Sequence, residues 1–197
     1  MTYRTLQSLR QNEDGATLVE FAMIAPVFLL MLIGMFDISH TLYTQAILQG
    51  TMQKAGRDSS LEGASGNQAA IEASVTSQVK KLVPSSTIEF ERKAYFDFSD
   101  IGQQELWDDD DGNGICDNGE PFEDANDNGQ WDADRGQDGF GGARDAILMT
   151  TTVTYDRLFP MYELMGLDQE ITLEASTVLR NQPYDNQDRS VTTGNCD

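Results

Sequence analysis

The sequence predicts an α+β protein with a long N-terminal membrane-anchoring helix, a second helix and a small antiparallel sheet into which an acidic segment is inserted. Residues 16–36 form an apolar run with one charged side chain, Glu20. In three later segments the side-chain pattern repeats every two residues, as it does in β-strands. These segments are residues 88–98, 147–155 and 171–179. Most of the negative charge lies between the first two of these segments. A sheet that buries one face against a helix then gives the α+β class.

Length and charge set the first limits on function. The chain has 197 residues, room for one ordinary domain, and its formal net charge is −20. Such a surface repels phosphate groups, so nucleic acid is not an expected partner. Residues 97–145 contain sixteen acids and two arginines, which places −14 of this charge in one segment. Two cysteines and one histidine exclude a Cys/His zinc framework and leave little for nucleophilic catalysis.

The apolar run is long enough to span a membrane. Its 21 residues, at about 1.5 Å each, cover roughly 30 Å, the thickness of the hydrocarbon core of a bilayer. A secretory signal peptide would be followed by a small-x-small cleavage site, and no such site follows this run. Apolar residues spaced three and four apart continue beyond Phe36, so we expect one helix over residues 16–61, transmembrane at about 16–36. The alternative is a buried core helix.

Three side chains of this helix need an explanation. Glu20 is costly in lipid unless a cation or hydrogen-bond donor pairs with it, or unless it reaches interfacial water. Pro26 removes a backbone hydrogen bond and is expected to kink or locally unwind the helix. His40 is interpreted as an interfacial polar residue, because the chain has no second histidine with which it could form a site.

Residues 62–197 are expected to form the α+β domain. Asn67 can cap the second helix, which Pro84 ends. The three alternating segments supply the sheet, and the acidic insertion covers about 99–142. The connection at residues 159–167 is apolar, and packing against the domain is favoured over contact with a partner.

Within the acidic insertion, residues 109–120 fit the calcium loop D-x-[DN]-x-[DN]-G-x5-E at every defined position. In such a loop alternate side-chain oxygens converge as the chain curls at Gly114, and calcium prefers oxygen ligands. A backbone carbonyl, a carboxylate that can act through water, and a bidentate glutamate complete the shell. The expected ligands are Asp109, Asp111, Asn113, the Ile115 carbonyl, Asp117 and Glu120.

The pattern begins again at Asp124. The expected ligands of this second loop are Asp124, Asn126, Asn128, the Gln130 carbonyl and Asp132. Its last position holds Arg135 rather than an acid. Three nearby acids could replace the missing carboxylate, namely Asp134, Glu123 and Asp138. The alternative is a solvated acidic linker that binds no metal.

The N-terminal residues resemble a known family. Residues 15–21, Gly-Ala-Thr-Leu-Val-Glu-Phe, followed by the apolar run, look like the processing site of type IVb pilins of the Flp/Tad system. The continuation at residues 26–34, 43–46 and 55–57 resembles TadE-like minor pilins or pseudopilins. The resemblance is close over residues 15–60 and looser in the C-terminal half.

This resemblance implies how the N-terminus is processed. A prepilin peptidase would remove a leader of residues 1–15 by cutting after Gly15. The cut would free the amine of Ala16, and Glu20, the fifth residue of the mature chain, would neutralise that amine in the same or a neighbouring subunit. Phe21 is the aromatic residue that follows this acid.

The resemblance also places the domain in the periplasm, or outside the cell if it enters a filament. Cys116 and Cys196 would then meet an oxidising environment. They could form a disulfide that ties the C-terminal tail to the first calcium loop, or they could remain two free thiols.

The expected function is that of a minor pilin or pseudopilin that primes, caps or joins the Tad/Flp pilus and carries calcium-stabilised loops. Its expected partners are other pilin or pseudopilin subunits, bound through the N-terminal helix, the prepilin peptidase and the inner membrane. The alternative is an unprocessed, membrane-anchored, calcium-binding adhesion or envelope module. An enzyme is not expected, because the carboxylates are better used as calcium ligands and no nucleophile has a recognisable partner.

Overall fold

The computed structural model describes residues 14–59, 68–159, 161–164, 166–181 and 191–196. The chain divides into two compact units. One contains the N-terminal residues up to Tyr43 and the segment Arg157–Gln169, and the other contains Thr44–Asp156 and the residues from Glu170 onward. Most of the expected leader, residues 1–13, lies outside the described residues.

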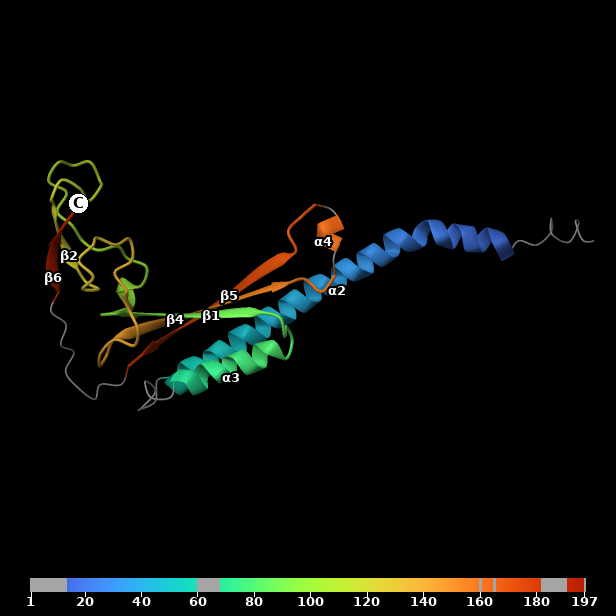
Figure 1. The fold of residues 1–197 in the computed structure, drawn as a ribbon, viewed down its shortest axis with the longest axis horizontal. Coiled ribbons are helices and arrows are strands. Elements are labelled where there is room, and N and C mark those ends of the chain that lie inside the picture. The colour runs from blue at the N-terminus through green and yellow to red at the C-terminus, as the bar shows by residue number, and fades with distance from the viewer. Residues whose placement is uncertain (1–13, 60–67, 160, 165, 182–190, 197) are drawn as a thin grey trace, which may run out of the picture. The chain divides into compact units, whose positions relative to one another are not determined.

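The longest element is helix α2, Asp14–Ser59, which is continuous over 46 residues (Figure 1). It stays helical through Pro26, without local unwinding at this residue. Its most apolar window of 18 residues has a mean hydropathy of 2.3 and contains no buried residue. Leu18 and Phe36, near the two ends of the apolar run, are 72% and 70% exposed. The helix is therefore long and apolar enough to cross a membrane, and its exposure argues against a buried core helix.

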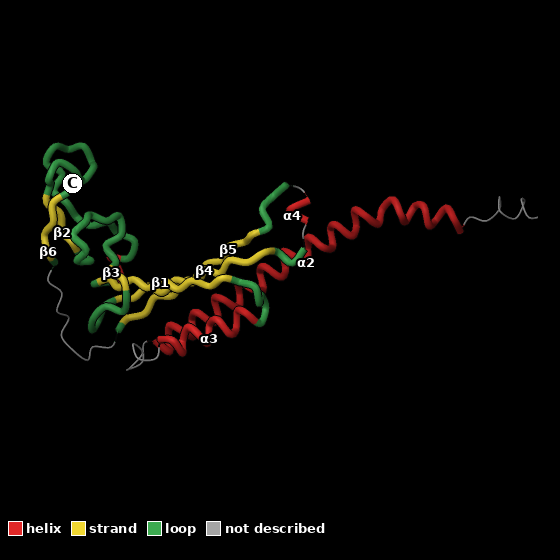
Figure 2. The backbone as a smooth tube through the Cα atoms, viewed as in Figure 1, coloured by secondary structure: helices red, strands yellow, loops and turns green. Residues whose placement is uncertain are grey.

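The second unit is built on a four-stranded antiparallel sheet (Figure 2). Its strands, in spatial order, are β3 (Gln137–Asp138), β1 (Thr87–Tyr95), β4 (Ala146–Asp156) and β5 (Glu170–Arg180). The C-terminal part of α2 and helix α3 (Gln68–Lys80) pack against this sheet and enclose a core. The described residues therefore confirm the predicted α+β class.

The core forms because each element presents one apolar face. Buried and half-buried residues alternate along β4, as expected for a strand with one face on the core. On α2 the buried side chains Leu48, Met52 and Ala55 recur at spacings of four and three, the period of one helix face. Val75 and Val79 do the same on α3.

Two contacts draw the helices close to the sheet. A Cβ atom added at Gly56 of α2 would come within 2.9 Å of Thr177 Oγ1 on β5, so glycine permits the close approach of helix and strand. The Arg92 guanidinium of β1 forms an ion pair with Glu72 of α3 at 2.6 Å. Arg92 also lies over the ring of Phe140, at 5.0 Å from its centroid.

One end of a predicted strand differs from the structure by more than one residue. β1 ends at Tyr95 rather than at residue 98, because Asp97 caps a short 3-10 helix, η2 (Phe98–Asp100). The Asp97 carboxylate accepts a hydrogen bond from Phe98 N, and Asp100 accepts one from Asp97 N. Phe96 and Phe98 alternate with polar residues, and this pattern predicted a strand. In the structure both rings are about half exposed.

The apolar connection between β4 and β5 also differs from expectation. It contains a short helix, α4 (Met161–Leu164), and belongs to the first unit. Within the segment 159–167, Leu167 is 55% exposed, so the expectation that this connection is packed is wrong for that side chain. Leu158, just before the segment, is 58% exposed.

Candidate functional site

The first acidic loop, residues 109–120, curls around the carboxylate of its first residue. Asp109 accepts hydrogen bonds from the backbone N–H groups of Gly112 at 2.8 Å, Asn113 at 3.0 Å and Gly114 at 3.0 Å. Gly114 has a φ of +77°, a conformation that side chains with a Cβ rarely adopt. The glycine of the calcium-loop pattern thus stands where the chain reverses.

Three carboxylates converge inside this loop. Asp109, Asp111 and Glu120 each place one oxygen within 4.8 Å of the others. Calcium binds oxygen at about 2.3–2.6 Å, so two ligands on opposite sides of one ion lie roughly 5 Å apart. The spacing of these three carboxylates therefore fits a calcium ion.

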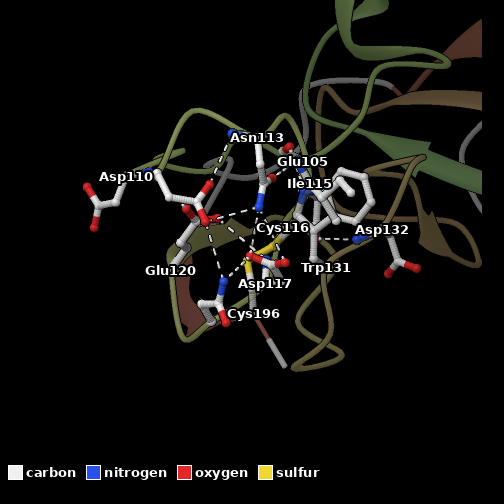
Figure 3. The surroundings of a disulfide bond; sticks show 12 residues. Glu105, Asp110, Asn113, Ile115, Cys116, Asp117, Glu120, Trp131, Asp132 and Cys196 are labelled. Atoms are coloured by element: carbon white, nitrogen blue, oxygen red, sulfur yellow. Dashed lines mark hydrogen bonds between the residues drawn. A yellow bond between two sulfur atoms is a disulfide. The ribbon is translucent and has the colours of Figure 1, made fainter.

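The remaining predicted residues of the first loop line the same turn (Figure 3). The amide Nδ2 of Asn113 lies 3.1 Å from Asp111 Oδ2 and 3.3 Å from Asp117 Oδ1. The side chain of Ile115 is 62% exposed, so its predicted contribution is limited to the backbone carbonyl. An electropositive amide group thus stands among carboxylates, where a cation would be favoured.

The second loop repeats these contacts. Asp124, which is 4% exposed, accepts hydrogen bonds from Asn128 N at 3.1 Å and Gly129 N at 2.7 Å. Gly129 has a φ of +78°, like its counterpart in the first loop. The amides of Asn126 and Asn128 both donate to Asp132 Oδ2, at 2.8 and 2.6 Å.

Glu105, a residue outside the loop, takes the place of the missing carboxylate. In the first loop Glu120 Oε1 accepts from the backbone N–H groups of the second and third loop residues, and Oε2 accepts from that of the ninth. Glu105 repeats this pattern in the second loop. Its Oε1 accepts from Ala125 N at 2.7 Å and Asn126 N at 3.4 Å, and its Oε2 from Asp132 N at 3.0 Å.

Glu105 is fully buried, and burial raises the pKa of its carboxyl above the usual range, although three backbone N–H groups oppose this shift. A carboxylate in such a place gains from a nearby cation. Sequence reasoning missed Glu105 because it precedes Asp124 and lies outside the loop spacing. The sequence offered one hint of its role: Glu105 is an acidic residue between η2 and the first loop that no strand or helix pattern explains.

The acids that the sequence offered as substitutes serve other purposes. Asp134 accepts hydrogen bonds from Lys93 Nζ at 2.8 Å and from the Tyr95 hydroxyl at 3.1 Å. Burial opposes ionisation of Asp134, but these donors outweigh it, so the pKa of Asp134 lies below its usual value. Glu123 Oε2 lies 3.9 Å from Arg135 Nη2.

The third substitute, Asp138, lies on β3, opposite Lys93 of β1. Arg135, which stands at the twelfth position of the second loop, forms a 3.2 Å ion pair with Asp100. The structure therefore brings none of the three suggested acids into the place that Glu105 fills.

A short ladder joins the two loops. Strand β2, Pro121–Asp124, runs from the residue after Glu120 to the first residue of the second loop and pairs with β6, Thr192–Asn195. A disulfide connects Cys116 with Cys196, whose Cα atoms are 5.3 Å apart (Figure 3). The backbone of Cys196 bonds to both sides of the turn, accepting from Gly119 N at 3.0 Å and donating to Glu120 O at 2.8 Å.

One tryptophan, Trp131, lies within the second loop, and the other, Trp107, packs against it. Trp131 donates from its Nε1 to the backbone oxygen of Glu105 at 3.0 Å. Its ring meets that of Trp107 edge to face, with 5.2 Å between the centroids. Trp107 is in turn bridged to Phe122 of β2. Trp131 therefore helps to position Glu105, and both indole groups can report on this loop optically.

The predicted processing residues lie in the first turns of α2. Gly15, Ala16, Glu20 and Phe21 are all exposed in the single chain, and the ring of Phe21 is 67% exposed. The surface around them continues into the apolar run. This part of the helix is therefore available for lipid or for another helix.

The described residues thus combine an α+β unit with a long, exposed apolar helix that could cross a membrane by its length and composition. Residues 15–57 match the family described as TadE-like protein, which confirms the resemblance seen in the sequence. The matched segment covers α2 almost to its end, and it relates the chain to the Tad pilus system and to a structural, non-enzymatic kind of protein. No curated protein and no solved structure matches the chain.

Proposed function

We propose that the protein is a minor pilin or pseudopilin that takes part in Tad/Flp pilus assembly. The observation that carries the proposal is the coincidence of the TadE-like segment, residues 15–57, with an exposed apolar helix. The helix would hold the protein in the inner membrane before assembly and pack against other pilin or pseudopilin subunits afterwards. The α+β unit would then lie in the periplasm, or outside the cell once in a filament.

In this proposal the prepilin peptidase cuts after Gly15, and Glu20 pairs with the freed amine of Ala16. A carboxylate in a membrane is stabilised by a cationic partner, which gives Glu20 its role. We expect Glu20→Ala to abolish pilus formation in the native host while the protein still reaches the membrane. Pili counted by electron microscopy, with a Glu89→Ala control on exposed β1, test this role, and normal piliation of Glu20→Ala would contradict it.

We further propose that each acidic loop binds one calcium ion. For the first loop the ligands are Asp109, Asp111, Asn113, the Ile115 carbonyl, Asp117 and Glu120. For the second loop they are Asp124, Asn126, Asn128, the Gln130 carbonyl, Asp132 and Glu105. The support comes from the convergence of three carboxylates in the first loop and from the matched hydrogen bonds of Glu105 and Glu120.

A bound calcium ion would be coordinated by oxygen atoms from separate parts of the chain and would so hold these parts together. Two ions would add four positive charges to a segment whose net charge is −14. The protein's own contribution is to hold the carboxylates together by backbone N–H donors, which lowers the cost of bringing like charges close. The loops would be stiffest in a calcium-rich environment outside the cytoplasm.

Isothermal titration calorimetry of the full chain in detergent micelles tests the calcium proposal. We expect binding of two ions per chain and a rise in melting temperature, because ligand at 100 times its Kd stabilises by about 2.7 kcal/mol per site. Magnesium serves as the control cation, because it needs a smaller and more rigid octahedral shell. No heat of binding together with an unchanged melting temperature would contradict the proposal.

The alternative function is an unprocessed, membrane-anchored, calcium-binding adhesion or envelope module. It shares the anchor and the loops, so only the state of the N-terminus separates it from a pilin. An N-terminal Met1 in the mature protein would favour the alternative, whereas Ala16 would favour the pilin.

A further inference from the structure

An ion pair attaches the β4–β5 connection, residues 157–169, to helix α2. Arg157 Nη1 lies 2.6 Å from Asp37 Oδ2. The Asp37 side chain is almost completely buried, and that of Arg157 is 18% exposed. Asp37 directly follows the apolar run of residues 16–36. The connection is therefore attached to α2 at the level where the membrane-spanning surface ends.

The connection has an internal structure that fixes its shape. The Arg157 guanidinium lies over the ring of Tyr162, 4.0 Å from its centroid. The backbone N–H of Arg157 donates to Gln169 O at 3.0 Å, and that of Leu167 donates to Tyr162 O at 2.8 Å. In Figure 1 α4, the short helix of this connection, lies beside α2. Arg157 thus holds both the helix and the connection in one arrangement.

Apolar side chains of this arrangement face outward. Leu158 and Leu167, which flank α4, are 58% and 55% exposed. On the neighbouring helix Phe36 and Ile38, on either side of Asp37, are 70% and 56% exposed. Exposed leucines on a water-facing loop would be costly, whereas the same leucines at a bilayer surface would be buried in lipid.

We propose that the β4–β5 connection docks on the lipid bilayer that α2 spans. Leu158 and Leu167 would insert at the boundary between headgroups and acyl chains. Tyr162 and Arg157 suit the headgroup layer, where amphipathic aromatic and basic side chains gather. This inference rests on the proposed membrane anchoring of α2.

Two observations favour lipid over another protein as the occupant. Leu158 directly follows Arg157, whose guanidinium pairs with Asp37 at the end of the apolar run, so the exposed leucines belong to a segment attached where the apolar surface of α2 ends. The charge of Asp37 is also neutralised by Arg157, so the ion pair can lie near the membrane at a lower electrostatic cost. The exposed acids Glu163 and Asp168 limit the insertion to a shallow depth, because their carboxylates must stay in water.

Fluorescent labels at single cysteines test this docking in the full chain. Both native cysteines are engaged in one disulfide, so a cysteine introduced at Leu158 or Leu167 is the sole free thiol under non-reducing conditions. Each labelled variant is reconstituted in phosphatidylcholine and phosphatidylglycerol vesicles. Quenching is then measured with nitroxide lipids labelled near the headgroup or near the chain end, and with aqueous iodide.

We expect both labels to be quenched more strongly by the shallow nitroxide than by the deep nitroxide, and only weakly by iodide. A label at Leu18, within the apolar run, should instead be quenched best by the deep nitroxide. Strong iodide quenching at Leu158 and Leu167, with the Leu18 label in lipid, would overturn the docking while leaving the anchor intact. A Leu18 label that iodide reaches would overturn the anchor and the docking together.

The ion pair and the occupant are tested in the same system. We expect Arg157→Ala to increase iodide quenching at Leu158 without changing the Leu18 signal, and circular dichroism should show an unchanged fold. Unchanged quenching at Leu158 would overturn the role given to Arg157. Label protection that appears only at high protein-to-lipid ratios would show contact between copies and would overturn lipid as the occupant.

Discussion

Glu105 and Glu120 hold the same place in two different loops. Glu120 Oε1 accepts a hydrogen bond from Asp110 N at 2.8 Å, and Glu105 Oε1 accepts one from Ala125 N at 2.7 Å. One acid is the twelfth residue of its loop, whereas the other comes from a separate segment. A terminal carboxylate is therefore present in both loops although the sequence pattern provides only one.

The first prediction concerns this shared role. We expect Glu105→Gln to reduce the number of bound calcium ions from two to one, because the second loop loses its terminal carboxylate. Terbium luminescence sensitised by Trp131 should be lost as well, while calorimetry should still detect the first loop. Glu123→Gln, which removes an exposed acid outside both ligand sets, is the matched control. Unchanged terbium luminescence in Glu105→Gln would show that Glu105 is no ligand.

The second prediction concerns the disulfide. Cys116 and Cys196 are 80 residues apart in sequence, so we expect Cys196→Ser to lower the free energy of unfolding by about 2–4 kcal/mol. Calcium affinity of the first loop should also fall, because the Cys196 backbone bonds to Gly119 and Glu120. The double variant Cys116→Ser/Cys196→Ser should match the single variant. If the disulfide does not stabilise the fold, Cys196→Ser will have the same melting temperature and calcium affinity as the unmodified protein.

The third prediction concerns the close approach of α2 to β5. Gly56→Ala places a methyl group against Thr177, and we expect it to destabilise the protein by roughly 1–3 kcal/mol. Gly50 lies on the same helix with no atom near its missing Cβ, so Gly50→Ala should stabilise by about 0.5–1 kcal/mol. Denaturant unfolding of both variants in the same detergent gives the comparison. Equal effects of the two substitutions would mean that helix and strand do not meet closely at Gly56.

The fourth prediction concerns pH. Burial alone raises the pKa of Glu72, but hydrogen bonds from Gln68 and Arg92 and the charge of Arg92 outweigh it, so this pKa lies below the ordinary 4.5. The ion pair therefore stabilises the fold above about pH 4.5, and this contribution is lost as the pH falls through the lower folded-state pKa.

We accordingly expect Glu72→Gln to cost about 1 kcal/mol near neutral pH, a value that allows for partial solvent screening, and nearly nothing in strong acid. The measurement is the free energy of unfolding as a function of pH. Glu89→Gln, at an exposed position on β1, is the control substitution. A cost of Glu72→Gln that is independent of pH would contradict the assigned ionisation.

The sequence predicted the fold wherever one face of an element had a regular pattern. Apolar alternation gave β4 and β5 to within a residue at each end, and the helical period gave α2. It could not give β2 and β6, which are four residues each and are held by pairing and a disulfide rather than by alternation. It also extended β1 too far, because the cap formed by Asp97 competes with the strand.

The same distinction, between local patterns and contacts of distant segments, applies to the candidate site. The proposed ligands within one loop have a fixed spacing, so a local pattern was enough to suggest them from Asp109 to Glu120. Glu105 depends on a tertiary approach of two segments, and the pairing of Arg157 with Asp37 spans 120 residues of sequence. No local pattern encodes either relationship.

The central claim is that the protein is processed and assembled as a pilin, and the mass of its mature N-terminal peptide tests this most directly. The protein is isolated from membranes and from sheared pili of the native host, and its N-terminal peptide is sequenced by mass spectrometry. We expect a mature chain that begins at Ala16, and we expect a Gly15→Leu variant to keep its leader and to form no pili. A mature chain that begins at Met1 in piliated cells would contradict it.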